Sequence, residues 1–176
     1  MTKKGNIYLV GFMGTGKSAV GRELARKKKW FFVDLDELIE LKERRSIPDI
    51  FSGSGEPYFR RVERQVLKEV AREHKFVVAC GGGIVINKDN IATMKDSGVV
   101  ICLKACVDAI FARTAQSAHR PLLNVPEPKK QIELLLKLRA PFYAGADKTI
   151  DTSKIPVQQV VARIARFLAQ KKAAKK

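Results

Sequence analysis

Short apolar segments alternate with longer amphipathic segments along most of the chain. The short segments have the length and apolar content of buried strands, and the longer ones place apolar residues three or four positions apart, as helices do. The expected strands cover 6–10, 30–33, 76–79, 99–103 and a short stretch near 149–150. The expected helices cover 17–28, 34–44, 55–73, 87–95, a segment from 107, 129–143 and 157–169, with one helical turn at 47–51.

This alternation predicts an α/β fold. Strands joined through helices form right-handed crossovers, which give a parallel sheet with helices on both faces. The chain has 176 residues, enough for one core, and shows neither internal repeats nor a linker. We therefore expect a single domain over 1–176, built as three layers around a sheet of about five strands.

One segment fits neither pattern. Residues 116–128 are polar, contain Pro121, Pro126 and Pro128, and show no apolar period. A loop of this length often closes over a bound substrate. We expect a mobile lid over about 115–128.

The formal net charge of +16 is high for a chain of this size. Basic proteins bind nucleic acids, anionic membranes or acidic small molecules. Here the charge is dispersed between 27–29 and the C-terminal tail, and no basic motif is interleaved with aromatic residues that could stack on bases. We interpret it as a solvated surface with anionic ligands and expect no nucleic-acid partner.

The chain has no apolar stretch long enough to cross a bilayer and no secretory signal at its start, so we expect a cytoplasmic protein without a membrane partner. The three cysteines, Cys80, Cys102 and Cys106, have no Cys-x-x-Cys spacing. We expect reduced thiols, and neither a disulfide framework nor a zinc site.

The strongest motif is Gly11–Ser18, which matches G-x-x-x-x-G-K-[ST] between an expected strand and an expected helix. Such a loop turns successive backbone N–H groups toward phosphate oxygens, and the helix that follows adds its positive dipole end. Lys17 is expected to reach the β- and γ-phosphates, and the Ser18 hydroxyl to bind Mg²⁺. The motif indicates a nucleoside triphosphate. No Asn-Lys-x-Asp motif of guanine-specific GTPases occurs.

Two carboxylates follow the second expected strand, at Asp34 and Asp36. Residues two apart at a strand end can both reach the edge where α/β proteins bind ligands. One carboxylate can serve Mg²⁺ while the other accepts a hydrogen bond from a substrate hydroxyl. Alternatively, Asp34 caps the next helix and Asp36 lies in its first turn, where acidic residues are common.

Six short motifs occur in one order. Besides the P-loop and Asp34-x-Asp36, they are Gly55-Glu56-x-x-Phe59-Arg60-Arg61, Gly81-Gly82-Gly83, Arg120-Pro121-Leu122-Leu123 and Leu138-Arg139-Ala140-Pro141-x-Tyr143. In this order and spacing the chain resembles the shikimate kinase family over essentially its whole length. The resemblance implies a P-loop kinase fold with sheet order 2-3-1-4-5, a mobile lid and an acceptor-binding region at about 34–61.

The resemblance also implies the residues of an acceptor site. Arg60 and Arg139 match arginines that bind the shikimate carboxylate, Gly82 matches a backbone contact with the substrate, and Asp36 matches the ligand of a substrate hydroxyl. Two guanidinium groups can hold one carboxylate through charge-assisted hydrogen bonds. The alternatives are a helix pair between Arg60 and Glu63 and a plain surface cation at Arg139.

On the nucleotide side the resemblance implies contacts from the P-loop and from two later segments. Asp34 matches the carboxylate on the Mg²⁺ side. Arg120 matches a lid arginine that neutralises phosphate charge during transfer, and without the resemblance it would be a solvated loop residue. The implied ATP ligands are Gly14, Thr15, Gly16, Lys17, Ser18, Ala19, Arg113, Arg120 and Pro156. The 151–156 loop has Lys154 and Pro156 where many relatives carry arginines, and His119 has no assigned role.

The implied reaction is ATP-dependent, Mg²⁺-assisted phosphorylation of shikimate to shikimate 3-phosphate by a monomer, with Lys17, Asp36 and Arg120 as catalytic residues. Two other activities remain open. A kinase of the same fold could act on gluconate or a nucleoside monophosphate, and a basic NTPase could hydrolyse ATP in association with nucleic acid.

Overall fold

The computed structural model describes residues 5–115, 123 and 125–174. The described chain forms one five-stranded sheet in the order β2-β3-β1-β4-β5, with each paired strand parallel to its neighbour, which confirms the expected topology. Its strands are β1 (Asn6–Val10), β2 (Phe31–Asp34), β3 (Phe76–Ala79), β4 (Gly98–Lys104) and β5 (Lys148–Asp151). Arg120, His119 and most of the expected lid lie outside the described residues.

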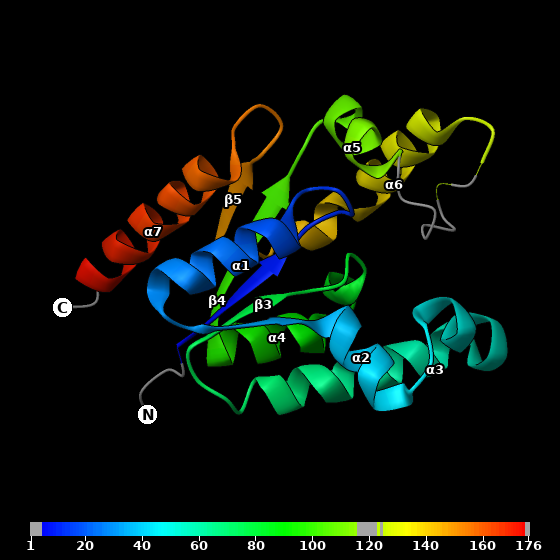
Figure 1. Ribbon diagram of the computed structural model, residues 1–176, viewed down its shortest axis with the longest axis horizontal. Helices are drawn as coiled ribbons and strands as arrows, with labels where there is room; N and C mark the ends of the chain where they lie inside the picture. Colours follow the sequence, from blue (N-terminus) through cyan, green and yellow to red (C-terminus); the bar gives the residue numbers. More distant parts are fainter. Residues whose placement is uncertain (1–4, 116–122, 124, 175–176) are drawn as a thin grey trace.

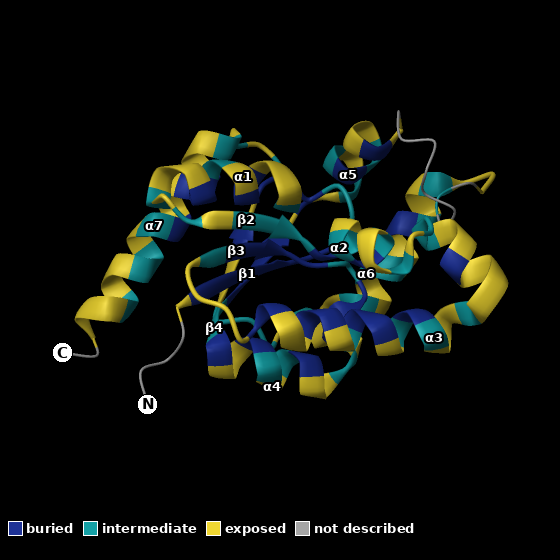
Figure 2. Ribbon diagram, turned by 60° about the horizontal axis from the view of Figure 1, so that its bottom comes forward, coloured by how far each residue is buried: buried dark blue, intermediate teal, exposed yellow. Residues whose placement is uncertain are grey.

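Helices cover both faces of the sheet (Figures 1 and 2). One face packs against α1 (Lys17–Lys28) and α7 (Val157–Ala173), and the other against α3 (Ile47–Val70) and α4 (Lys88–Ser97). In the described ranges the remaining helices are α2 (Leu35–Glu43), the 3₁₀ turn η1 (Ile84–Ile86), α5 (Val107–Thr114) and α6 (Pro128–Tyr143). The architecture is the expected three-layer arrangement.

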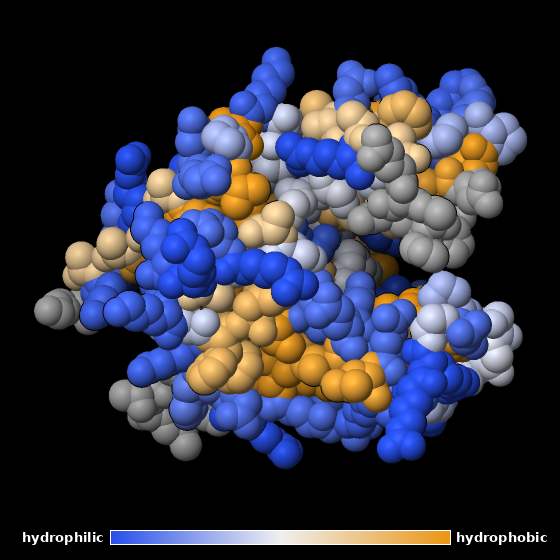
Figure 3. Space-filling view, in the orientation of Figure 1, coloured by the Kyte–Doolittle hydropathy of each residue, from blue (hydrophilic) through white to orange (hydrophobic). Residues whose placement is uncertain are grey.

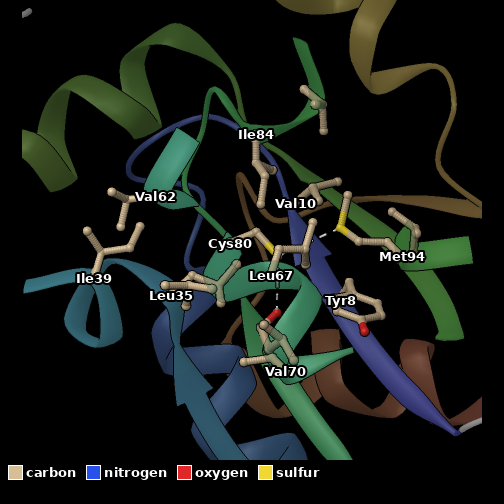
Figure 4. Packing of buried hydrophobic residues seen from close by; sticks show 14 of the residues in the cluster. Tyr8, Val10, Leu35, Ile39, Val62, Leu67, Val70, Cys80, Ile84 and Met94 are labelled. Atoms are coloured by element: carbon tan, nitrogen blue, oxygen red, sulfur yellow. Dashed lines mark hydrogen bonds between the residues drawn. The ribbon is translucent and has the colours of Figure 1, made fainter. Parts of the chain in front are cut away.

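The central strand β1 contributes apolar side chains to both faces of the sheet. Tyr8 and Val10 point into the core on the α3–α4 side, while Ile7 and Leu9 point into the core on the α1–α7 side. Since side chains alternate along a strand, a strand covered on both faces must be apolar throughout. Figure 4 shows the first of these cores, where Tyr8 and Val10 lie among side chains such as Leu67 and Met94.

The structure differs from the expected elements in detail. The expected turn at 47–51 and the helix from Gly55 form one helix, α3, which is interrupted at Gly55 by a backbone φ of 80°. The strand β2 runs from Phe31 to Asp34, one residue later than expected, and α7 continues to Ala173. The turn η1 is too short to produce a periodic pattern in the sequence.

Three loops meet at the carboxyl edge of the sheet. The P-loop follows β1, Asp34 is the last residue of β2, and the glycines at 81–83 follow β3. Since these strands are adjacent and parallel, their carboxyl ends lie side by side, the usual ligand-binding edge of an open α/β sheet. Figure 3 shows the surface hollowed at this edge, between the α5–α6 side and the α2–α3 side. Within the described chain, no helix has the length and apolar content needed to cross a membrane.

Candidate active site

The P-loop has the strand-before and helix-after context that its motif requires. Gly14 and Gly16 have φ values of 74° and 96°, a left-handed region that residues with a side chain rarely adopt. The Lys17 ammonium donates to the carbonyl oxygens of Gly11 at 2.9 Å and Phe12 at 3.0 Å. This geometry holds the ammonium over the loop, where a bound phosphate chain would also lie.

Ser18 and Asp34 come together across two elements. Ser18 lies in the first turn of α1, and its hydroxyl donates to Asp34 Oδ2 at 2.8 Å. The other oxygen of this carboxylate, Oδ1, accepts from the Asp36 backbone N–H at 3.0 Å, so Asp34 also caps α2. The capping interpretation of Asp34 is therefore confirmed, while its Mg²⁺ role stays a prediction that the contact of the other oxygen with Ser18 allows.

Asp36 lies in the first turn of α2 beside the P-loop. Burial, and then the neighbouring Asp34 carboxylate, raise the pKa of Asp36 to about 6, although the Lys17 ammonium opposes this shift. A carboxylate with a raised pKa is a better proton acceptor than an ordinary surface aspartate. The position and the pKa of Asp36 therefore suit a group that accepts a hydroxyl proton.

The glycine turn at 81–83 is the point at which the expected acceptor ligands meet. A Cβ atom added to Gly81 would lie 3.0 Å from Asp36 Oδ1, and one added to Gly82 would lie 3.4 Å from Arg139 Nη1. A Cβ atom added to Gly83 would collide with the guanidinium of Arg60. The structure thus brings Asp36, Arg60, Gly82 and Arg139 around one turn, although they come from four separate segments of the chain.

Glu63 belongs to this site, although the sequence suggested it only as a helix partner of Arg60. Its carboxylate is almost fully buried at 1% exposure, and its Oε2 accepts from Arg60 Nη1 at 2.8 Å. Arg60 also bonds to Glu56, with Nη2 and Oε1 separated by 3.1 Å. The expected helix pair with Glu63 therefore exists and holds the guanidinium against the glycine turn.

The second oxygen of Glu63, Oε1, is buried and finds no hydrogen-bond partner within the described part of the chain. It would lie 3.2 Å from a Cβ atom on Gly81, on the side where Asp36 Oδ1 also lies. Burial raises the pKa of Glu63, and the Asp36 carboxylate raises it further, while Arg60 lowers it. Arg60, Glu63 and Gly83 also line a cavity of about 690 Å³ between α3 and the start of α4. The unpaired Oε1 can accept a hydrogen bond from a ligand hydroxyl.

Gly83→Ala is expected to raise the KM for the acceptor about tenfold and to lower the melting temperature, because the displaced Arg60 guanidinium loosens its ion pair with the buried Glu63. Gly83 has φ −95° and ψ −3°, which alanine adopts without strain, so the added methyl group displaces only the flexible end of Arg60. Steady-state kinetics against both substrates, with a thermal melt, would check this. Gly53→Ala is the control, since a Cβ atom there would meet nothing closer than 3.9 Å. An unchanged acceptor KM would show that the position of Arg60 does not matter.

Arg113, near the C-terminal end of α5, connects the P-loop to the 151–156 loop. Its guanidinium donates to Gly14 O at 3.2 Å and to Thr152 O at 2.6 Å. The Thr152 hydroxyl is buried and donates to Thr15 O at 2.9 Å. Arg113 and Thr152 thus tie the 151–156 loop to the P-loop. Thr152 was not singled out from the sequence, because its partners lie far away along the chain.

The other expected nucleotide ligands lie nearby in the fold. Ala19 is exposed in the first turn of α1, and Pro156 is exposed at the N-cap of α7. Arg120 lies outside the described residues. Within the described chain, no three residues of the types His, Cys, Asp or Glu cluster to hold a metal ion, and Cys80, Cys102 and Cys106 are free thiols.

Comparison with known proteins identifies relatives of this chain. The sequence profile of a family described as "SKI: Shikimate kinase" matches residues 13–169. A shikimate kinase of Thermodesulfovibrio yellowstonii is 42% identical over 92% of this chain and 93% of its own length. A shikimate kinase of Thermoanaerobacter pseudethanolicus is 42% identical over 92% of this chain and 94% of its own length.

Solved structures give the same result. A shikimate kinase from Acinetobacter baumannii, solved in complex with shikimate, superposes with a TM-score of 0.91 and 38% identity over 96% of this chain and 95% of that one. A shikimate kinase from Aquifex aeolicus superposes with a TM-score of 0.80 and 33% identity over 96% of this chain and 98% of that one. Both matches extend over nearly the whole of each chain.

Proposed function

Because the chain belongs to the shikimate kinase family, we propose that it transfers the γ-phosphoryl group of ATP to the 3-hydroxyl of shikimate. The product, shikimate 3-phosphate, lies on the route to chorismate and the aromatic amino acids. The observation that carries the proposal is the meeting of Arg60, Arg139 and Asp36 at one glycine turn beside the P-loop. In a hydroxylated carboxylic acid, the two arginines can bind the carboxylate and the Asp36 carboxylate can accept a hydrogen bond from the hydroxyl.

At the acceptor end, Arg60 and Arg139 bind the shikimate carboxylate. Guanidinium groups are suited to this because they stay charged and donate in a planar fork. Gly82 offers backbone contact where a Cβ atom would approach Arg139. Asp36 accepts a hydrogen bond from the reacting hydroxyl and takes its proton during transfer. The fixed orientation of the acceptor contributes most of the rate enhancement expected here.

At the nucleotide end, the backbone N–H groups of residues 14–19 hold the phosphates and Lys17 neutralises charge on the β- and γ-oxygens. Arg113 and Pro156 are proposed as the two walls around adenine, because Arg113 is already fixed against the loop that contains Pro156. Arg120 is proposed as the lid arginine that meets the transferred group. The lid, proposed over about 115–128, excludes water that would otherwise accept the phosphoryl group.

Mg²⁺ is the proposed metal. The Ser18 hydroxyl and the Asp34 carboxylate converge within 2.8 Å, and they provide the oxygen ligands that Mg²⁺ prefers, alone or through water. When bound, the ion would neutralise negative charge on the phosphates. Ser18 and Asp34 therefore fit as the protein's contribution to a site that is completed by the nucleotide and water.

Ser18→Ala is expected to raise the free Mg²⁺ concentration needed for half-maximal activity by about tenfold. The substitution removes one oxygen ligand and the hydrogen bond that orients Asp34. The test is activity titrated against free Mg²⁺ at saturating ATP and shikimate. Ser52→Ala serves as the control, because Ser52 is an exposed serine whose hydroxyl donates to Asp49 O within α3. An identical Mg²⁺ titration for Ser18→Ala and the wild type would contradict the metal assignment.

Three further features belong to the proposal. The protein acts as a monomer, because one chain supplies every proposed ligand of both substrates. We place it in the cytoplasm. Residues at about 34–61 form the acceptor-binding region of a single domain over 1–176. Its partners are ATP and shikimate, with no role for nucleic acid or a membrane in the reaction.

The reaction is tested by identifying the product. Purified protein with ATP, Mg²⁺ and shikimate should yield one phosphate monoester, and ³¹P–¹H coupling should place the phosphate on the 3-position carbon. A phosphate on another ring carbon would overturn the proposed orientation of shikimate. Consumption of ATP without formation of a phosphate monoester of shikimate would show that shikimate is not the acceptor.

A further inference from the structure

Tyr143 joins helix α6 to the glycine turn. It is the last residue of α6, and its hydroxyl donates to Gly82 O at 2.7 Å across 61 positions of sequence. Its ring packs against the core cluster of Tyr8, Val10 and the α3–α4 helices. A hydroxyl bond between such distant segments fixes the end of α6 relative to the turn after β3.

Arg139 lies one helical turn before Tyr143. Its guanidinium stands over the Phe12 ring at 5.6 Å and lies close enough to the Tyr143 hydroxyl to lower the pKa of that hydroxyl. Arg139 Nη1 also lies where Gly82 has no side chain, 3.4 Å from an added Cβ atom. The arginine, the tyrosine and the glycine thus meet at one point.

The chemistry of the three groups fixes how the Tyr143 hydroxyl is oriented. A guanidinium only donates and a backbone carbonyl only accepts, whereas a phenol can do both. The Tyr143 hydroxyl donates its proton to Gly82 O, which leaves its oxygen lone pairs free to face the nearby Arg139 guanidinium. Burial raises the pKa of Tyr143 to about 12, so the hydroxyl keeps its proton, and with it this arrangement, throughout the neutral range.

We infer that Tyr143 is a positioning residue for the acceptor, because its hydroxyl holds Arg139 and the Gly82 backbone in the relative placement that binds shikimate. The inference rests on the proposed function and extends it. Tyr143 need not touch shikimate. It acts by restricting a flexible arginine before the substrate arrives, and a preorganised ligand loses less entropy on binding.

This role predicts a selective effect on one substrate. Tyr143→Phe keeps the ring and removes only the hydroxyl. The dissociation constant for shikimate, measured by calorimetry without nucleotide, is expected to rise about tenfold, as for the loss of one or two buried hydrogen bonds. The dissociation constant for ATP and the kcat should stay within about twofold of the wild type, because the P-loop is untouched.

Tyr8→Phe is the matched control. Tyr8 is also a buried tyrosine whose hydroxyl makes a 2.7 Å bond, to Ser97 Oγ, but it lies in the core away from the turn. This variant should lower the melting temperature without changing shikimate affinity. If Tyr143→Phe behaves in the same way, or if it weakens ATP and shikimate equally or fails to fold, Tyr143 is a structural residue and the inference is wrong.

A double-mutant cycle tests the route through Arg139. In an Arg139→Ala background the hydroxyl has no guanidinium to hold, so adding Tyr143→Phe should weaken shikimate binding by less than about threefold. A further tenfold loss would show that Tyr143 acts independently of Arg139. Activity of the wild type distinguishes a failure of the proposed function from a failure of this inference. If the wild type does not phosphorylate shikimate, the proposed function is wrong. If the wild type is active and Tyr143→Phe binds shikimate with unaltered affinity, only this inference is wrong.

Discussion

Asp36→Asn is expected to lower the kcat for shikimate phosphorylation by about a thousandfold. The amide cannot take a proton from the reacting hydroxyl, while its size and position stay the same. ATP affinity should be retained, because the substitution leaves the P-loop and the bonds of Lys17 to Gly11 O and Phe12 O in place. Single-turnover kinetics with shikimate, together with a nucleotide-binding titration, measure both quantities.

The same substitution should stabilise the free protein. The pKa of Asp36 in the folded protein is about 6, above the ordinary aspartate value of 3.8, so the folded state favours the protonated form. Ionisation of Asp36 therefore lowers the free energy of unfolding, and this stability is lost as the pH rises through about 6. Asp36→Asn is expected to raise the free energy of unfolding at pH 7.5 by about 1 to 3 kcal/mol and to change it little at pH 4.

The control is the neighbouring carboxylate. Glu37→Gln removes an exposed charge that pairs with Arg22 at 3.1 Å, a contact worth little in water. Turnover and stability should both stay near the wild-type values. If Asp36→Asn keeps more than a tenth of the wild-type kcat, or destabilises the protein at pH 7.5, the assignment of Asp36 as a buried proton acceptor is wrong.

Acidification offers an independent test of Asp36. Because the carboxylate becomes protonated as the pH falls below about 6, its acceptance of a hydrogen bond from shikimate should be lost there. The dissociation constant for shikimate in the absence of nucleotide is expected to rise below this pH, and Asp36→Asn should remove the change between pH 5 and 7. A wild-type affinity that is constant from pH 5 to 7 would contradict this role.

The second large effect is expected at the carboxylate clamp. Arg139→Ala should lower kcat/KM for shikimate by about a thousandfold, because the shikimate carboxylate loses one of its two guanidinium partners. ATP binding should change little. Steady-state kinetics with shikimate and a direct ATP titration separate the two. Arg139→Lys should recover only part of the loss, since an ammonium keeps the charge but not the planar fork.

Lys137→Ala controls for charge on the same helix. Lys137 is exposed and pairs with Glu133 at 3.0 Å, one turn away along α6. This variant should keep shikimate kinetics within about twofold of the wild type. Near-normal transfer by Arg139→Ala, or an equal loss in Lys137→Ala, would show that α6 supplies general positive charge instead of a specific carboxylate ligand.

The sequence predicted most of the fold, for reasons that are local. Strands β1 to β4 are short, largely apolar runs, whereas β5 has Ile150 as its one buried residue, and the alternation with helices predicts the parallel sheet. The order 2-3-1-4-5 came from the family resemblance, and the structure confirms it. The P-loop was predictable because its chemistry lies in eight consecutive residues, whose strand–loop–helix context is visible in the sequence.

The contacts within the site were harder to predict. Glu63 reads as an ordinary surface partner of Arg60, and only the packing of α3 against the sheet shows that it is 1% exposed. Tyr143 and Thr152 act through hydrogen bonds to Gly82 and Thr15, which lie 61 and 137 positions away. No periodicity or spacing in a single sequence reports such distances. The interruption of α3 at Gly55 was partly visible, since glycine marked the expected start of a helix there.

Release of ADP from ATP·Mg²⁺ by the purified protein, measured with shikimate, gluconate and single-stranded RNA in parallel, tests the choice of acceptor. We expect strong stimulation by shikimate and background rates with gluconate and RNA. Stimulation by gluconate or RNA without a response to shikimate would leave the ATP site in place and contradict the acceptor assigned to Asp36, Arg60 and Arg139.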